Sequence, residues 1–179
     1  MMIQTWRHLL HLADRIDRLT SAIGTSAAWL ALLIVLTQFA VVLMRYVLGV
    51  GSIWLSESIL YFHAALFMLA AAWTLQQNAH VRVDIFYAEA SSGGRALVDL
   101  FGALLLLMPF AVVIVLFSVP YVARSWTILE RSRETSGLPI VFLLKTLIPL
   151  FALLLALQGI AQAIRAAARL YRTQAGPSS

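Results

Sequence analysis

The sequence predicts an all-α integral membrane protein, with four transmembrane helices and an amphipathic surface helix before them. Hydrophobic residues make up 61% of the 179 residues and charged residues only 12%, whereas soluble domains carry about 25% charged residues. The mean hydropathy is +0.88. Four long apolar segments are separated by short polar ones, and a spanning helix needs about 20 apolar residues. We therefore expect one four-helix membrane domain over residues 1–172 and a disordered tail over residues 173–179.

The first predicted element is an amphipathic helix over residues 3–19. Apolar side chains such as Ile3, Trp6 and Leu10 recur at spacings of three and four, while His and Arg residues occupy the other face. Trp on the apolar face and Arg on the polar face are typical of a helix on a membrane surface or against a partner. A solvated extension of the first spanning helix is the alternative that amphipathicity alone does not exclude.

Four predicted spans follow, over residues 21–44, 59–78, 96–123 and 139–164. Gly24 and Ala28 form a pair of small residues typical of close helix packing in lipid. The third span would be about 42 Å long as a helix, against a hydrocarbon core of about 30 Å. We therefore expect it to tilt, or to kink at Pro109. Pro139 suits the first turn of the fourth span.

Basic residues predict the orientation. Four spans place both termini on one side of the membrane, and that side carries eight Arg residues, while the other carries four Arg residues and Lys145. The positive-inside rule predicts cytoplasmic termini, with the loop 124–138 outside. The formal net charge of +5 reflects this clustering at the ends of apolar runs, so a nucleic-acid site is not predicted.

The most distinctive stretch begins at Arg45, which closes the first span. Trp54 and Glu57 stand one helical turn apart at the start of the second span, so opposite charges meet at one membrane face. Beyond the second span, polar residues alternate with apolar ones, as in a short extended or amphipathic segment. These polar residues are His80, Arg82 and Asp84.

This order of residues resembles the small membrane subunit (DctQ-like) of tripartite ATP-independent periplasmic (TRAP) transporters. The resemblance is carried by Arg45, Tyr46, Gly49, Trp54, Glu57, His80, Val81, Arg82, Val83 and Asp84. With the four-helix layout it covers almost the whole chain. Many relatives carry a Gly in the second span where this chain has Ala70, Ala71 and Ala72. The segment 136–149 resembles the branch associated with keto, hydroxy or chloroaromatic acids.

The resemblance implies a non-catalytic subunit of the bacterial inner membrane. It would scaffold a large elevator-type membrane subunit (DctM-like) that imports organic acid anions with sodium. A periplasmic substrate-binding protein (DctP-like) would capture and deliver the substrate, and the small subunit would help to dock it. Membrane lipids are the remaining expected partner.

Individual polar residues admit two interpretations each. For Glu57, we favour a structural or inter-subunit ion pair with Arg45 over a proton or cation relay, because buried ionisable groups normally find a partner. For Lys145, we favour snorkelling or a partner contact over contact with an anionic substrate. His63 lies well inside the second span, where a helix-contact hydrogen bond is expected. For His80, Arg82 and Asp84, the resemblance favours a segment needed for folding or assembly over a solvated loop.

Charges on the loop after the third span are candidates for electrostatic steering of the binding protein. They are Arg124, Glu130, Arg131, Arg133 and Glu134.

Two other functional classes remain as alternatives. A free-standing four-helix transporter resembling small multidrug exporters needs an embedded Glu in its first span, and this span has no acidic residue. A membrane redox or haem anchor would need a second haem ligand at the depth of His63. The chain has no Cys and no recognisable metal, nucleotide or nucleophile motif, so no catalytic residue, cofactor or metal is predicted.

Overall fold

The computed structural model describes residues 2–80, 87 and 90–174, and its regular elements there are all helical. The first hairpin consists of α1 (Met2–Tyr46) and α2 (Ile53–Gln76). A third rod joins α4 (Ser92–Phe101), the π-helical segment η1 (Gly102–Leu107) and α5 (Met108–Thr127), and α6 (Val141–Gln174) follows. All four rods are long and apolar enough to cross a membrane. The prediction of an all-α chain with four long apolar helices is confirmed.

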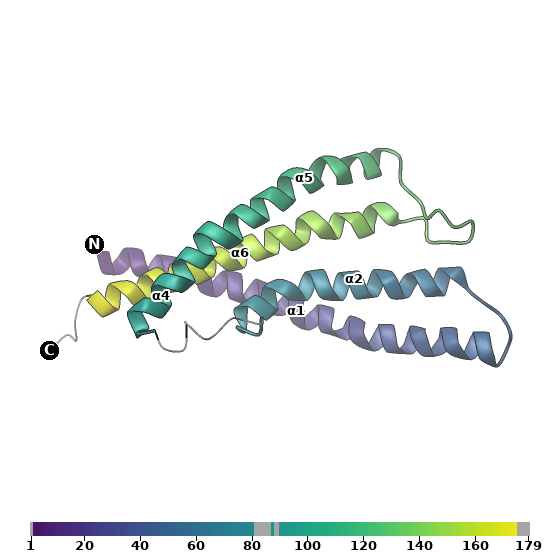
Figure 1. The fold of residues 1–179 in the computed structure, drawn as a ribbon, viewed down its shortest axis with the longest axis horizontal. Coiled ribbons are helices and arrows are strands. Elements are labelled where there is room, and N and C mark those ends of the chain that lie inside the picture. The colour runs from purple at the N-terminus through teal and green to yellow at the C-terminus, as the bar shows by residue number, and fades with distance from the viewer. Residues whose placement is uncertain (1, 81–86, 88–89, 175–179) are drawn as a thin grey trace.

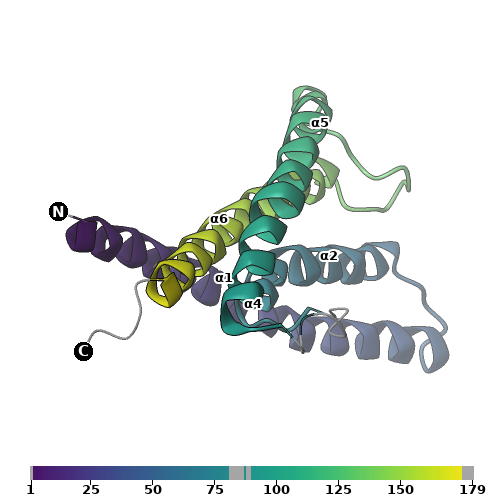
Figure 2. The ribbon, with the colours of Figure 1, turned by 60° about the vertical axis from the view of Figure 1, so that its left-hand side comes forward.

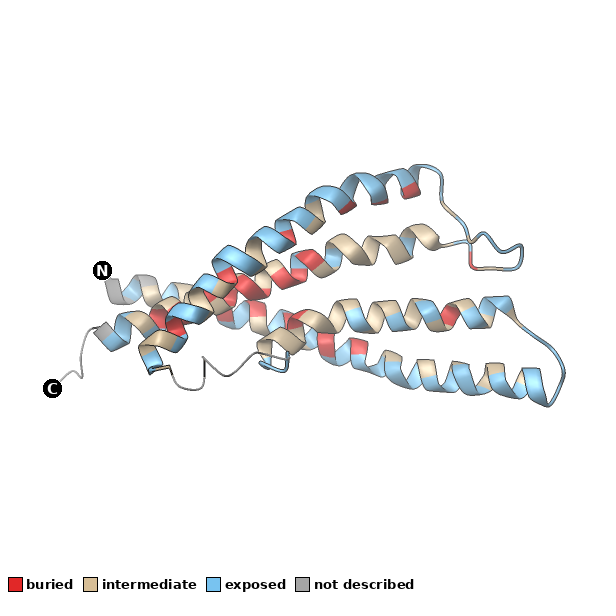
Figure 3. Ribbon diagram, viewed as in Figure 1, coloured by how far each residue is buried: buried red, intermediate tan, exposed pale blue. Residues whose placement is uncertain are grey.

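Helix α6 is the centre of the arrangement, because it packs against α1, α2, α4, η1 and α5. Buried residues gather where these helices meet, and the two hairpins diverge from there towards loops 47–52 and 128–140 (Figures 1, 2 and 3). Ala72 of α2 and Leu154 and Leu155 of α6 form one buried cluster in this region. Much of the remaining surface is large and apolar, for example Val35 and Phe117, as expected for helices that face lipid or other membrane helices.

The N-terminal amphipathic segment is not a separate helix. Residues 3–19 belong to α1, which continues without a break to Tyr46. Ala13 and Ile16 of its apolar face are buried in a cluster with Ala161 of α6. The amphipathic pattern is therefore explained by packing against α6, and the predicted separate surface helix is corrected to the first part of a long helix.

The third rod accommodates Pro109 through η1. Proline lacks an N–H, and inside an α-helix its ring clashes with the carbonyl four residues earlier. Immediately before it, the Met108 N–H bonds to the carbonyl of Ala103, five residues back, which is the spacing of a π-bulge. The irregularity in the helix that the sequence predicted at Pro109 therefore lies in the π-helical turn immediately before this residue. α6 extends to Gln174, and the rest of the predicted tail lies outside the described residues.

Close packing of α1 on α2 depends on Gly24. A Cβ added to Gly24 would lie 2.6 Å from the Trp73 Cγ, a distance that real side chains do not adopt. Ala27 is also buried, whereas Ala28 is exposed. The small residues at this contact are therefore Gly24 and Ala27, one position away from the predicted pair.

Candidate functional site

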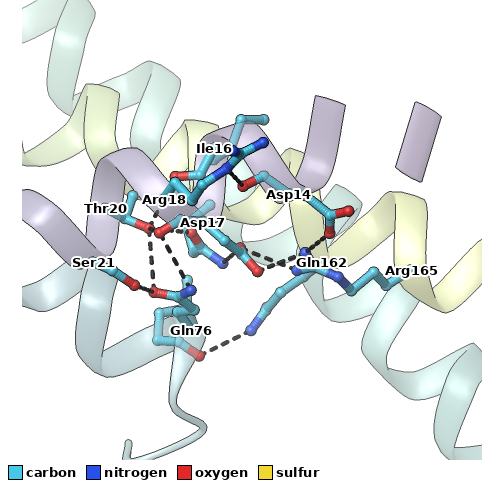
Figure 4. Close-up of polar contacts among 11 residues, drawn as sticks. Asp14, Ile16, Asp17, Arg18, Thr20, Ser21, Gln76, Gln162 and Arg165 are labelled. Atoms are coloured by element: carbon cyan, nitrogen blue, oxygen red, sulfur yellow. Dashed lines mark hydrogen bonds and ion pairs between the residues drawn. The ribbon is translucent and has the colours of Figure 1, made fainter. Parts of the chain in front are cut away.

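Polar side chains of three helices converge where α1 crosses α6 (Figure 4). We call this group the crossing cluster; its members are Asp14, Asp17, Thr20, Ser21, Gln76, Gln158, Gln162 and Arg165. Gln158 is completely buried, and Thr20 almost so. The Gln158 Nε2 donates to the Asp17 Oδ1 at 3.0 Å, and its Oε1 accepts from the Thr20 hydroxyl at 2.9 Å.

Arg165 bridges the two acids of the crossing cluster. Its Nη2 lies 2.5 Å from the Asp17 Oδ2 and 3.1 Å from the Asp14 Oδ1, and its Nη1 donates to the Asp17 Oδ1 at 3.0 Å. A buried charge without a partner costs several kcal/mol, roughly, in a low-dielectric interior. The chain therefore pairs its charges internally at this depth, which is the chemistry of a structural cluster.

The same cluster holds the end of α2. The Gln76 Oε1 accepts from the Ser21 hydroxyl at 2.9 Å, and its Nε2 donates to the Asp17 carbonyl at 3.3 Å. The Gln162 Nε2 donates to the Leu75 carbonyl at 3.1 Å. The Leu75 carbonyl also accepts the Asn78 N–H at 3.1 Å, so Gln162 adds a second hydrogen bond, from α6, at the end of α2.

Sequence reasoning missed this convergence. It did not single out Gln158, and it counted Arg165 only among the eight Arg residues that predict the orientation. The available signal was the spacing of Gln158, Gln162 and Arg165, which places them on one face of α6. Asp14 and Asp17 share a face of α1 for the same reason. Which face of α1 meets α6 is a tertiary fact that spacing does not provide.

Glu57 binds the loop between α5 and α6 (residues 128–140), which we call the α5–α6 loop. Its Oε2 accepts the Leu138 N–H at 2.6 Å, and its Oε1 accepts the Ser132 hydroxyl. Arg45 lines the same pocket as Glu57, but no ion pair joins these two described residues. This carboxylate therefore links the two hairpins at the end where they diverge.

A second carboxylate fixes the same loop from the other side. The Glu130 Oε2 lies 2.5 Å from the Lys145 Nζ and accepts the Ser125 hydroxyl at 2.7 Å. The Lys145 Nζ also lies 4.1 Å from the centre of the Tyr121 ring, within the range of a cation–π contact. The hydrogen bond from Lys145, and then that from Ser125, lowers the pKa of Glu130.

The remaining predicted residues divide into exposed and undescribed ones. Arg124, Arg131, Arg133 and Glu134 are exposed on or beside the α5–α6 loop, and Trp54 is exposed at the start of α2. His80 is exposed after the end of α2. Arg82 and Asp84 lie outside the described residues. Among the described residues, no group of three His, Cys, Asp or Glu is arranged to hold a metal ion.

One polar side chain is exposed in the middle of α2. His63, near the centre of this 24-residue helix, is exposed on the chain surface. Ser56, Leu60 and Phe67 are also exposed, and their spacing of three and four places all four residues on one stripe. We call this stripe the His63 face.

Comparison with known protein families identifies a family to which this chain is similar. A family model described as "Tripartite ATP-independent periplasmic transporters, DctQ component" matches residues 34–169, and so confirms the resemblance predicted from the sequence. No curated protein and no solved structure matches the chain. The matched range includes Glu57, the α5–α6 loop and the α6 part of the crossing cluster, but begins after the α1 part.

Proposed function

From the premise that the chain belongs to the DctQ family of TRAP transporters, and is thus a small, non-catalytic, multi-pass membrane component, we propose that it scaffolds a large DctM-like transport subunit. That subunit imports organic acid anions together with sodium, and a periplasmic DctP-like protein delivers the substrate. The complex lies in the bacterial inner membrane, with both termini of this chain in the cytoplasm, as its Arg distribution favours.

The observation that carries the scaffold role is the exposed His63. An imidazole facing lipid at mid-span would leave its N–H and its ring nitrogen lone pair without partners, which is unfavourable in hydrocarbon. Polar residues within spans usually face other protein or water. The large subunit therefore covers the His63 face and supplies a hydrogen-bond partner there.

The α5–α6 loop supports a docking role at the periplasmic side. Glu57 of α2 and Lys145 of α6, which binds Glu130, hold it from two helices, while Arg124, Arg131 and Arg133 remain exposed. A loop that is ordered before binding loses less entropy when a partner docks. Exposed charges on it mainly increase the association rate and select the partner. We assign the first contact with the binding protein to this surface.

The other predicted residues receive assembly roles. His80, Arg82 and Asp84 lie on the cytoplasmic side in this orientation, where they contribute to folding or to contact with the large subunit. Lys145 and the start of α6 belong to the segment that resembles the keto, hydroxy or aromatic acid branch. Because Lys145 binds Glu130 within the chain, we infer that the branch difference is structural and that other subunits select the substrate.

Co-expression with the large subunit tests this proposal. An affinity tag on this chain should retain the large subunit after membrane solubilisation. Liposomes with both subunits and the binding protein should accumulate a carboxylate when an inward sodium gradient is imposed, whereas liposomes with this chain alone should not. Uptake by the chain alone would favour a free-standing transporter, and visible haem absorbance of the purified chain would favour a redox anchor. Either result contradicts the proposal.

A further inference from the structure

A second pocket lies between the first turns of α1 and the last turns of α6, and all of its lining residues except Ala168 are outside the matched family range. Trp6, Arg7 and Leu10 line it on one side, and Ala168, Tyr171 and Arg172 on the other. Its volume is about 190 Å³. The Trp6 and Tyr171 rings are stacked, with centroids 5.8 Å apart. We call it the terminal pocket.

The terminal pocket lies close to the depth at which α4 begins to expose large apolar side chains. Gly93 of α4 stands beside Thr173 of α6, because a Cβ on Gly93 would contact the Thr173 Cγ2 at 3.7 Å. Four residues later, about 6 Å along a helix, α4 exposes Leu97 and then Val98 and Phe101. The headgroup layer on each side of a bilayer is about 5–7 Å thick. Tyr171 therefore lies at headgroup depth, where Trp and Tyr are enriched.

Two guanidinium groups at this pocket are available to a ligand. In the part of the chain that the structure describes, neither Arg7 nor Arg172 has an ion-pair partner, and both are exposed. Two neighbouring arginines differ in this respect. Arg165 is bound to Asp14 and Asp17, and Arg169 lies 3.4 Å from Asp99. Arg7 and Arg172 are therefore the lining residues of this pocket that can offer a positive charge to a ligand.

We propose that the terminal pocket binds an anionic phospholipid, with its phosphate between Arg7 and Arg172 and its glycerol region against Trp6 and Tyr171. Guanidinium groups bind phosphate oxygens with two parallel hydrogen bonds. Basic pockets between helices at a membrane face are suited to acidic headgroups. The lipid would join the start of α1 to the end of α6 beyond the crossing cluster.

Native mass spectrometry of the purified full chain in detergent tests the site. The probes are phosphatidylglycerol and cardiolipin, with phosphatidylcholine as the neutral comparison. Wild type should retain the anionic lipids selectively. The double variant Arg7→Gln/Arg172→Gln should bind phosphatidylglycerol about 10- to 30-fold more weakly, because each arginine near the surface contributes to headgroup binding. The control Arg124→Gln/Arg131→Gln removes the same charge at the other end and should bind like wild type.

Several outcomes would overturn the proposal. These are equal affinity of wild type and the Arg7→Gln/Arg172→Gln variant for phosphatidylglycerol, equal retention of phosphatidylcholine, or displacement of the lipid by millimolar inorganic phosphate. Circular dichroism establishes that the variant remains helical. If it does not fold, Arg7→Lys/Arg172→Lys keeps the charge but loses the paired hydrogen bonds, and should still weaken binding several-fold. Unchanged binding by that variant would also contradict the proposal.

Discussion

Leu138 donates its backbone N–H to the Glu57 carboxylate at 2.6 Å, although 81 positions separate the two residues in the chain. This hydrogen bond, with that from Ser132 to the same carboxylate, joins the α1–α2 hairpin to the loop of the α5–α6 hairpin. The helices themselves diverge at this end (Figure 1). The relative position of the two hairpins there depends on one acidic side chain and a loop, whereas at the other end it depends on helix packing.

Glu57→Gln should therefore loosen the α5–α6 loop, because an amide has one acceptor oxygen and its NH₂ group opposes one of the two donors. We expect a midpoint of thermal unfolding lower by a few degrees and faster proteolysis between residues 128 and 140. Arg45→Gln should change both far less. Complex yield, not turnover per assembled complex, should fall with Glu57→Gln. A double-mutant cycle with strong coupling between Arg45 and Glu57 would contradict this.

Gly137→Ala tests the same junction through packing. A Cβ at Gly137 would lie 2.7 Å from the Glu57 Oε1 and would also collide with Ser132, so the loop must move away from α2. We expect the effect of Glu57→Gln to be reproduced although every polar group remains. Gly51→Ala is the matched control, since a Cβ there meets nothing within 4 Å. Equal loop proteolysis in the two variants would show that the junction is not closely packed.

Gln158→Leu should destabilise the crossing cluster. Gln158 is completely buried, and the substitution removes its hydrogen bonds with the Thr20 hydroxyl and the Asp17 Oδ1, so that Arg165 alone still donates to that oxygen. The expected cost is about 1–3 kcal/mol of unfolding free energy. Gln38→Leu, at an exposed position of α1, is the control and should be nearly neutral. Adding Thr20→Val should cost less than the sum of the single changes, because both members of one hydrogen bond are then removed. Denaturant unfolding in detergent measures all three.

The sequence predicted the helices well because a bilayer imposes a length and a composition on any span. It failed where the result depends on which faces meet. Residues 3–19 have the pattern of a surface helix, but Ala13 and Ile16 bury that face against α6. The sequence predicts that Glu57 pairs with the charge of Arg45. In the structure, its carboxylate instead accepts hydrogen bonds from a backbone N–H and a hydroxyl of a distant loop. Only tertiary structure brings Leu138 to that position.

Stability should depend on acid pH through Glu130. The pKa of this carboxyl is lowered by hydrogen bonds from Lys145 and then Ser125, so the folded state favours the ionised form. The resulting stabilisation is present above the unfolded pKa, about 4.3 for Glu, and is lost as the pH falls through the lower folded value. Thermal unfolding between pH 7 and pH 3 should show this loss in wild type. In Glu130→Gln the midpoint should fall less over the same range, and an equal fall in both would contradict the assignment.

The partner-facing surface can be mapped because the chain contains no Cys. A photoactivatable crosslinker on Leu60→Cys or Phe67→Cys, which lie on the His63 face, should capture the large subunit in co-expressed membranes. The same crosslinker attached at Phe117→Cys, a highly exposed position of α5, should not capture the large subunit. Capture only from α5 would reject the His63 face while leaving the subunit role intact, whereas failure of the two proteins to co-purify would reject the role itself.

His63 itself should contribute a hydrogen bond to that interface. Interhelical hydrogen bonds in membranes contribute about 0.6 kcal/mol on average, so His63→Leu should weaken association about threefold. His63→Asn, which keeps a donor and an acceptor, should recover part of the loss. The unfolding midpoint of the isolated chain should not fall in either variant, since His63 is exposed there. Weaker association with an unchanged isolated chain distinguishes an interface residue from a residue needed for folding, because a folding residue would lower both.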